Sequence, residues 1–126
     1  MPDINFHKKF VDTKTCVLIP TYNNEQTLQT VIESVLEYTT NVLVVNDGST
    51  DSTAQILKQF PQIHIAGYAV NQGKGFALQT GFKEAIQLGY DNVISIDSDG
   101  QHFAKDLPEF LEYLETKGQA LVIGAR

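Results

Sequence analysis

The sequence predicts an α/β fold in which a mainly parallel sheet carries helices on both of its faces. Short apolar runs rich in β-branched residues alternate with longer segments whose apolar residues recur at helical spacing. Each of the first four apolar runs is followed by a polar loop. A length of 126 residues, with 42% hydrophobic and 19% charged residues, suits one folded domain rather than a disordered or fibrous segment.

The first predicted element follows a polar lead-in segment, residues 1–14. Residues 15–19 form an apolar run that stops at Pro20, which is typical of a buried strand. The next segment predicts a helix with Asn23 or Asn24 as its N-cap. Its apolar residues fall on one helix face: Leu28, Val31, Ile32, Val35 and Leu36.

This strand, loop and helix unit is predicted three more times. Residues 42–45 form the second apolar run, and the short helix after it ends at Pro61. The third run, residues 63–70, precedes a helix whose expected buried face is Leu78, Phe82, Ala85 and Ile86. The fourth, residues 92–96, precedes a helix expected to bury Leu107, Phe110, Leu111 and Leu114. A fifth strand is predicted at residues 120–123.

The four polar loops are expected along one rim of the sheet. Parallel neighbours need crossover connections, and these place the carboxyl ends of the strands at the same edge. Ligands of such sheets bind beyond the carboxyl ends of the strands. We therefore expect the functional residues in these loops.

The fourth loop contains two carboxylates two residues apart, Asp97 and Asp99, directly after an apolar strand. Residues at this spacing point to the same side of an extended segment, and their charges repel unless a cation lies between them. Oxygen ligands suit Mg²⁺ or Mn²⁺, with Gln101 as a third candidate. The alternative is a solvated loop in which Asp106 caps the next helix. The position at the rim favours the metal site.

Two other loops offer candidate contacts to a nucleotide. Asp47 ends the second strand, where its carboxylate is placed to accept hydrogen bonds from a uracil or guanine edge; a purely structural turn with Asp51 as a helix cap is the alternative. Residues 71–75 open a helix, so their backbone N–H groups and Lys74 are placed to face an anion. The spacing fits neither a Walker loop nor a dinucleotide fingerprint. His102 is a candidate contact for a diphosphate or an acceptor.

Charge and cysteine content exclude other classes. A net charge of -6 disfavours nucleic acid as a partner, because nonspecific binding to phosphates needs clustered Lys and Arg. The single cysteine, Cys16, lies in an apolar run and is expected in the core. The chain lacks a signal-like start and a run of about 18 apolar residues, so neither export nor a membrane span is expected. The expected location is cytoplasmic.

Four motifs resemble those of the family 2 glycosyltransferases, which have the GT-A fold, and occur in the order and spacing of that family. They are Val17-Leu18-Ile19-Pro20-Thr21-Tyr22-Asn23-Asn24-Glu25, Val45-Asn46-Asp47-Gly48-Ser49-Thr50-Asp51, Asn71-Gln72-Gly73-Lys74-Gly75 and Ile96-Asp97-Ser98-Asp99-Gly100-Gln101-His102. The resemblance extends over nearly the whole chain after Lys14. It implies that residues 15–126 are the nucleotide-sugar-binding half of a truncated GT-A domain.

The resemblance implies a UDP- or GDP-linked sugar as the donor. Asp97, Asp99 and Gln101 would hold Mg²⁺ or Mn²⁺ and the diphosphate. The residues implied at the nucleotide are Pro20, Thr21, Tyr22, Glu25, Asp47, Lys74 and Asp97. Among these, Asp47 would bind the base. No candidate for the usual catalytic base is present, since it would belong to the acceptor half, and inversion by direct displacement is implied.

The last motif is most similar to the branch that transfers sugars to polyprenyl phosphates. A polyprenyl phosphate or a glycan is therefore the implied acceptor, and membrane attachment at the cytoplasmic face would belong to a region beyond this chain. Ser98 stands where alanine is expected. In the family sheet a later antiparallel strand lies between the strands at Asn92 and Ala120, so its absence would expose an edge that we expect to pair with a neighbouring chain.

Two other functions compete with a glycosyltransferase. The chain is alternatively a truncated module that binds a sugar nucleotide without transferring the sugar. The other rival is a phosphohydrolase of the haloacid dehalogenase type, whose carboxylates also follow an apolar strand as Asp-x-Asp-Gly. Gln101 stands where that family requires Thr or Val, and three strand-loop-helix units precede Asp97 where that motif normally opens the domain.

Overall fold

The computed structural model describes residues 4–98, 107–109, 111–112 and 121–124. Within these residues, five parallel strands form one sheet in the order β3-β2-β1-β4-β5. The strands are β1 (Thr15–Thr21), β2 (Val42–Asp47), β3 (His64–Tyr68), β4 (Asn92–Ile96) and β5 (Leu121–Gly124). The predictions for Asp99, Gln101, His102, Asp106, Phe110 and Leu114 lie outside the described residues.

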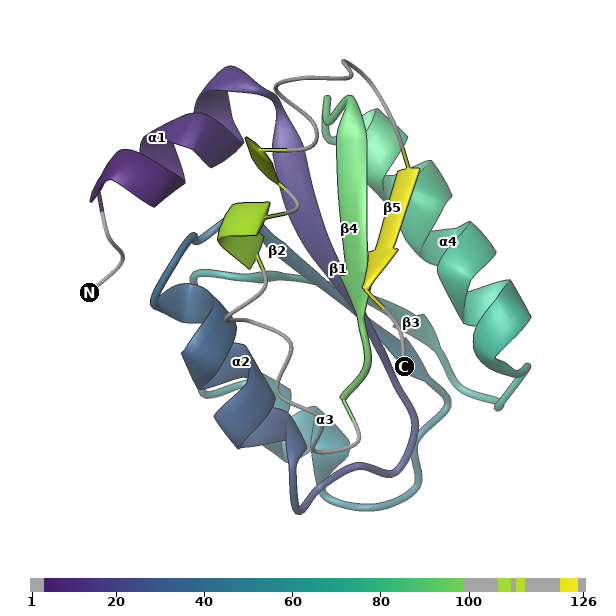
Figure 1. The fold of residues 1–126 in the computed structure, drawn as a ribbon. Coiled ribbons are helices and arrows are strands. Elements are labelled where there is room, and N and C mark those ends of the chain that lie inside the picture. Colours follow the sequence, from purple (N-terminus) through teal and green to yellow (C-terminus); the bar gives the residue numbers. More distant parts are fainter. Residues whose placement is uncertain (1–3, 99–106, 110, 113–120, 125–126) are drawn as a thin grey trace.

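Helices cover both faces of this sheet, as predicted (Figure 1). They are α1 (Ile4–Asp12), α2 (Leu28–Leu36), α3 (Thr53–Leu57) and α4 (Lys74–Gln87). The helices α1, α2 and α3 lie on one face, and α4 lies alone among them on the other. The buried Leu107 and Leu111 belong to the core on the α2 face. The three-layer α/β architecture is therefore confirmed.

Strand β1 is central to both cores because it is buried along its whole length. Val17 and Ile19 join the core beneath α2, whereas Cys16 and Leu18 join the core beneath α4, as alternation along a strand requires. Cys16 is fully buried, which confirms its expected place in the core. This burial raises the pKa of its thiol to about 12. The strand continues through Pro20 to Thr21. The described pairing of β1 with β4 ends at Leu18, so one side of the strand is unpaired at Pro20. A proline is tolerated at such a position because it has no N–H to donate.

The lead-in segment before Thr15 contains the helix α1, which was not predicted from the sequence. Phe10 of α1 is fully buried in the core beneath the sheet, and Phe6 makes an edge-to-face contact with Tyr38 at a centroid distance of 5.6 Å. The two phenylalanines are four residues apart and therefore lie on one helix face. Residues of the lead-in segment therefore pack against the core, and the domain boundary at 14/15 stays a prediction.

Two predictions about helices are wrong in detail. The N-cap of α2 is Thr27, and the side chain of Asn24 instead accepts hydrogen bonds from Thr21, Tyr22 and Ser98. In α4 the predicted Ala85 is buried and Leu78 and Phe82 are partly buried against the core, but Ile86 is 73% exposed, and the helix also buries Ala77 and Gly81. A Cβ placed on Gly81 would lie 2.5 Å from Leu18 Cδ1, so α4 approaches the sheet through its small residues, and this turns Ile86 outward.

The edge of β4 is occupied, contrary to the expectation of an exposed edge. Strand β5 pairs with β4 in parallel, with Val93 opposite Leu121 and Ile96 opposite Gly124. No gap for another strand remains between these two described strands. Self-association of the chain stays a prediction, although not through this edge, and sedimentation that shows a clean monomer would contradict it.

Candidate functional site

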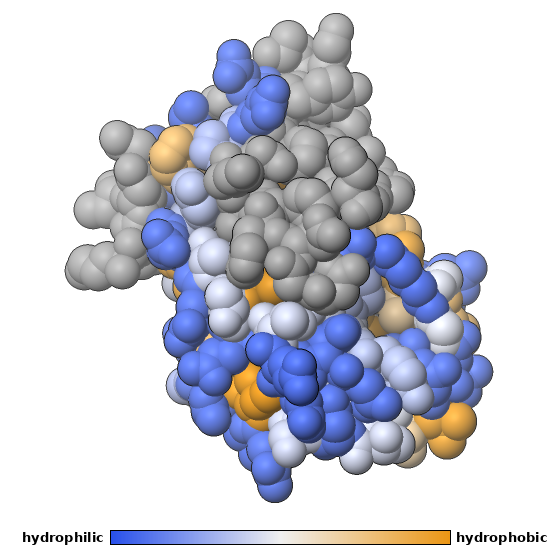
Figure 2. All heavy atoms as spheres, turned by 60° about the horizontal axis from the view of Figure 1, so that its bottom comes forward, coloured by the Kyte–Doolittle hydropathy of each residue, from blue (hydrophilic) through white to orange (hydrophobic). Residues whose placement is uncertain are grey.

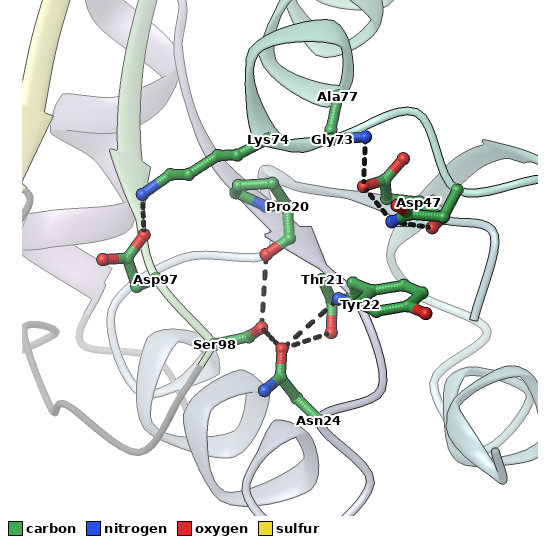
Figure 3. A pocket seen from close by; sticks show the side chains of 11 residues that line it. Pro20, Thr21, Tyr22, Asn24, Asp47, Gly73, Lys74, Ala77, Asp97 and Ser98 are labelled. Atoms are coloured by element: carbon green, nitrogen blue, oxygen red, sulfur yellow. Dashed lines mark hydrogen bonds and ion pairs between the residues drawn. The ribbon is translucent and has the colours of Figure 1, made fainter. Parts of the chain in front are cut away.

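A pocket of about 410 Å³ lies at the carboxyl ends of the central strands, where the sequence predicted the site. This volume falls in the range of small-molecule sites. Its walls come from the last residues of β1 and β2, from the loops after β1, β3 and β4, and from the start of α4 (Figure 3). The lining residues are Pro20, Thr21, Tyr22, Asn24, Asp47, Asn71, Gly73, Lys74, Ala77, Asp97 and Ser98. Figure 2 brings this rim forward, and its described surface is mostly hydrophilic.

Asp47 is almost fully buried, with 3% of its surface exposed. Its Oδ1 accepts hydrogen bonds from Tyr68 Oη at 2.6 Å and from the backbone N–H of Gln72 at 2.9 Å. Its Oδ2 accepts from Asn71 Nδ2 at 2.8 Å and from the backbone N–H of Gly73 at 3.1 Å. A carboxylate offers about four acceptor positions, so donors among the described residues engage all of them. Asp47 therefore fixes the segment that leads into α4, and its contact with a base stays a prediction.

The hydroxyl of Tyr68 depends on this carboxylate. Desolvation, together with the hydrogen bond to Asp47 and the charge of Asp47, raises the pKa of Tyr68 to about 12. Because the folded pKa lies above the ordinary value of about 10, the stabilisation is fully present below pH 10 and is lost as the pH rises toward 12. The ring also packs edge-to-face on Phe76 at a centroid distance of 5.2 Å.

Tyr68→Phe is expected to lower the free energy of unfolding by about 1.5 kcal/mol at pH 7, since a hydrogen bond to a charged group is lost. The variant should also lose less stability than the wild type between pH 10 and pH 12. Urea unfolding at pH 7, 9 and 11 measures both effects. Tyr22→Phe, whose ring is 44% exposed, is the control. Equal stability of Tyr68→Phe and the wild type at pH 7 would contradict the role given to this hydrogen bond.

Lys74 and Asp97 face each other across the pocket. Lys74 is the first residue of α4, and Asp97 follows β4, so strands and helix bring together two residues 23 positions apart. The distance from Lys74 Nζ to Asp97 Oδ1 is 2.6 Å. The Lys74 side chain is 54% exposed and that of Asp97 is 19% exposed, so both remain accessible to a ligand. The pocket thus presents a cation and a carboxylate at one point.

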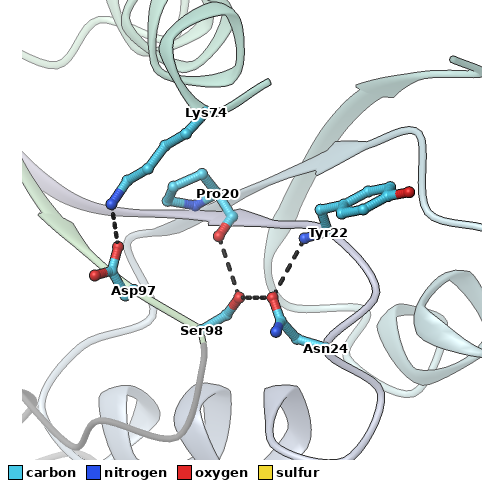
Figure 4. Close-up of polar contacts among 6 residues, drawn as sticks. All are labelled: Pro20, Tyr22, Asn24, Lys74, Asp97 and Ser98. Atoms are coloured by element: carbon cyan, nitrogen blue, oxygen red, sulfur yellow. Dashed lines mark hydrogen bonds and ion pairs between the residues drawn. The ribbon is translucent and has the colours of Figure 1, made fainter. Parts of the chain in front are cut away.

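Ser98 and Asn24 join the fourth loop to the first (Figure 4). Ser98 Oγ lies 2.7 Å from Asn24 Oδ1 and 3.2 Å from the carbonyl oxygen of Pro20. Asn24 Oδ1 also accepts from Thr21 Oγ1 and from the backbone N–H of Tyr22, each at 3.3 Å. Sequence reasoning missed both residues, because a contact between positions 74 apart leaves no local pattern.

Glu25 is placed away from this pocket. It borders a separate hollow with Asp51, where Glu25 Oε1 accepts the backbone N–H of Ser52 and Asp51 Oδ2 accepts the backbone N–H of Glu25. Desolvation acts to raise the pKa of Asp51, but hydrogen bonds, among them those from the backbone N–H groups of Thr53 and Glu25, outweigh it and hold the pKa below its ordinary value. These contacts join the first two loops, so the part of Glu25 in nucleotide binding remains a prediction.

The residues present fit a divalent metal in part. Asp97 supplies a carboxylate on the pocket wall, which is a donor that Mg²⁺ and Mn²⁺ prefer. The other two predicted ligands, Asp99 and Gln101, lie outside the described residues. Among the residues that are described, no group of three His, Cys, Asp or Glu side chains is placed to hold a metal ion. The metal site therefore stays a prediction centred on Asp97.

The sequence model described as "Glycosyl transferase family 2" matches residues 16–126, which is most of the chain. The chain belongs to glycosyl transferase family 2. This assignment confirms the resemblance seen in the four motifs.

Among family relatives, an undecaprenyl-phosphate mannosyltransferase of Micrococcus luteus is 32% identical over 119 residues, which cover 90% of this chain and 48% of that protein. A dolichyl-phosphate β-glucosyltransferase of Trichomonas vaginalis is 30% identical over 129 residues, with coverages of 87% and 39%. The chain spans about half the length of such relatives or less.

Among solved structures of this fold, glucosyl-3-phosphoglycerate synthase from Mycobacterium tuberculosis in complex with UDP matches with a TM-score of 0.70. The identity is 25%, and the match covers 90% of this chain and 44% of the synthase. The same synthase is also solved with Mn²⁺, UDP and glucosyl-3-phosphoglycerate, at the same TM-score and identity. The predicted GT-A fold is thereby confirmed.

Proposed function

We propose that the pocket binds the nucleoside-diphosphate part of a sugar donor and that this chain is the donor half, residues 15–126 with α1 added, of a glycosyltransferase that uses Mg²⁺ or Mn²⁺. The meeting of Lys74 and Asp97 at 2.6 Å on the rim of the sheet carries the proposal. An ammonium group neutralises phosphate charge directly, whereas a carboxylate reaches a phosphate through a bridging cation. The complexes of the synthase with UDP and with Mn²⁺ support the same chemistry.

Transfer of the sugar leaves negative charge on the diphosphate. A bound Mg²⁺ or Mn²⁺ would stabilise that charge electrostatically. In this chain Asp97, Asp99 and Gln101 are the proposed ligands, and Lys74 adds a second positive charge at the start of α4. The backbone N–H groups of Gln72 and Gly73 are already engaged by Asp47, so the proposed anion contact at the start of α4 is the Lys74 ammonium group. We also propose that the transfer inverts the configuration at the anomeric carbon, which is tested by determining the anomeric configuration of the product.

Lys74→Met is expected to weaken UDP binding about tenfold or more, because one contact to a charged group is worth about 1.5–3 kcal/mol. The aliphatic stem is kept and the charge is lost. Calorimetric titration of UDP with Mn²⁺ present measures the change. Lys83→Met, an exposed position on the same helix, is the matched control and should bind as the wild type does. Equal UDP affinities of Lys74→Met and Lys83→Met would show that Lys74 does not contribute to UDP binding.

The donor base and the metal are tested together by titrating UDP and GDP with Mn²⁺, with Mg²⁺ and with chelator. The proposal predicts tight binding of one nucleotide that depends on the metal. Binding that is equal with and without chelator would refute the metal, and no binding under any condition would refute the donor site in this chain. A contact of Asp47 with the base predicts a preference between UDP and GDP that shrinks in Asp47→Asn.

A polyprenyl phosphate is the proposed acceptor, since the relatives from Micrococcus luteus and Trichomonas vaginalis are named for transfer to such lipids. A phosphate acceptor is already ionised and needs little help from a base. Transfer of labelled sugar to a polyprenyl phosphate would support it. Metal-dependent binding without transfer would favour the alternative of a module that binds the donor only.

The site of action proposed with this acceptor is the cytoplasmic side of a membrane. Among the described helices, none is long and apolar enough to cross a bilayer. Fractionation of cells that contain the chain tests the location, and recovery of the chain from an extracellular fraction would contradict it.

A further inference from the structure

Ser98 is held by hydrogen bonds both through its side-chain hydroxyl and through its backbone carbonyl oxygen. It follows Asp97 directly, and only 2% of its surface is exposed. Its hydroxyl donates across the pocket to Asn24 Oδ1 at 2.7 Å, and its carbonyl oxygen accepts a hydrogen bond from Thr27 Oγ1 at 2.5 Å. One residue therefore joins the end of β4 to the loop after β1, as Figure 4 shows, and also to the start of α2 through Thr27.

The contact from Thr27 replaces a local one. An N-cap threonine usually turns its hydroxyl onto the backbone N–H groups of its own helix. Thr27 is the N-cap of α2, yet its side chain makes no capping hydrogen bond within the described structure. Its hydroxyl reaches Ser98 instead, 71 positions along the chain. The start of α2 is thus oriented toward the carboxylate loop.

Asn24 carries the connection onward to the opposite wall. The same Oδ1 that accepts from Ser98 accepts from Thr21 Oγ1 and from the backbone N–H of Tyr22. Thr21, Tyr22 and Asn24 line one side of the pocket, and Asp97 and Ser98 line another. A shift of either wall would break these hydrogen bonds, so the two walls hold their separation together.

We propose that Ser98 is a positioning residue that couples metal binding to nucleotide binding, by fixing the segment of Asp97 against the wall formed by Thr21, Tyr22 and Asn24. The inference rests on the proposed donor site. A metal held at Asp97 then contacts the diphosphate of a nucleotide held at the first loop only when the two pocket walls keep their separation. Loss of the Ser98 hydroxyl removes the bond to Asn24 and leaves the carboxylate segment with the backbone tether from Thr27, so the separation of the two walls is held less firmly.

The test is the ratio of the UDP dissociation constant in chelator to that in saturating Mn²⁺. The ratio is measured by calorimetric titration for the wild type and for Ser98→Ala, with thermal unfolding of the same samples without ligand. In Ser98→Ala the ratio is expected to fall about three- to tenfold, a change in coupling within the usual range. Asn24 keeps its bonds to Thr21 and Tyr22, so the variant should fold.

Three further variants separate positioning from stability. Thr27→Val removes the second tether and should lower the ratio in the same direction, whereas Thr27→Ser keeps the hydroxyl and should restore it. Ser34→Ala removes a serine hydroxyl bonded to the carbonyl oxygen of Val31 within α2 and should leave the ratio unchanged. A purely structural role for Ser98 predicts a lower unfolding temperature with an unchanged ratio.

The outcomes distinguish this inference from the proposed function. Metal-dependent binding by the wild type, with equal ratios in Ser98→Ala and Ser34→Ala, would overturn the coupling role and leave the donor site intact. A wild type that binds no UDP with Mn²⁺ would overturn both. A reduced ratio in Ser98→Ala and Thr27→Val that returns in Thr27→Ser is the expected result.

Discussion

Gly48→Ala is expected to lower the free energy of unfolding by at least about 3 kcal/mol, which places it among strongly destabilising substitutions. Gly48 has φ +67°, a left-handed conformation that an alanine adopts at a cost of about 1 kcal/mol. A Cβ there would also lie 2.2 Å from the backbone nitrogen of Asn71 and 2.4 Å from the carbonyl carbon of Val70. The larger part of the effect comes from these backbone contacts, because backbone atoms cannot rotate away.

The same substitution is expected to disturb the pocket. Asn71 bonds Asp47 through Nδ2, and a forced shift of residues 70–71 moves the segment that leads to Lys74. Urea unfolding measures the stability, and UDP titration measures the site. Gly89→Ala is the matched control, since Gly89 has φ +91° but no described atom lies within 4 Å of its added Cβ. A loss in Gly48→Ala no larger than that in Gly89→Ala would show that the close approach of the two loops is unimportant.

Asp97→Asn is expected to weaken Mn²⁺-dependent UDP binding by at least about 100-fold. The substitution keeps the shape of the side chain but removes the charge that a divalent cation requires, and even indirect disturbance of a metal ligand typically costs about 10- to 100-fold in affinity. In chelator the affinity should change far less, because Lys74 is released from its ion pair and stays available to the phosphates.

The stability of Asp97→Asn should differ from that of the wild type by no more than about 1 kcal/mol, since an ion pair whose lysine side chain is 54% exposed contributes little. Asp91→Asn, an exposed carboxylate just before the other end of β4, is the control and should bind as the wild type does. Parallel titrations of the two variants measure the difference. Metal-dependent binding that survives in Asp97→Asn would place the metal elsewhere.

The fold follows from local patterns wherever those patterns are strong. The fourth strand occupies residues 92–96 as predicted, because an apolar β-branched run between polar turns has few alternatives. The buried face of α4 was predicted in part. Leu78, Phe82 and Ala85 pack on the core as expected, whereas Ile86 is exposed, because the close approach of Gly81 to Leu18 determines which side of the helix faces the sheet. Helix α1 was missed because its buried Phe10 stands among charged neighbours.

The sequence predicted the location of the site through the rule that ligands bind beyond the carboxyl ends of parallel strands. That rule brings Asp47, Lys74 and Asp97 into one pocket, and the structure confirms that they line it together. It does not reveal which partners each side chain has. Tyr68 engages Asp47 from 21 positions away, and Ser98 engages Asn24 from 74 positions away, and both contacts depend on how the loops fold over one another.

The most direct test of the donor site is to locate the bound metal by nuclear magnetic resonance. A small amount of Mn²⁺ added with UDP broadens the amide signals of nearby residues. Broadening is expected to begin at the signals of Thr21, Gly73, Lys74 and Asp97, to leave those of α1 sharp, and to be abolished by Asp97→Asn. Broadening that instead centres on Glu25 and Asp51, or that appears equally without UDP across the acidic surface, would contradict the proposed site.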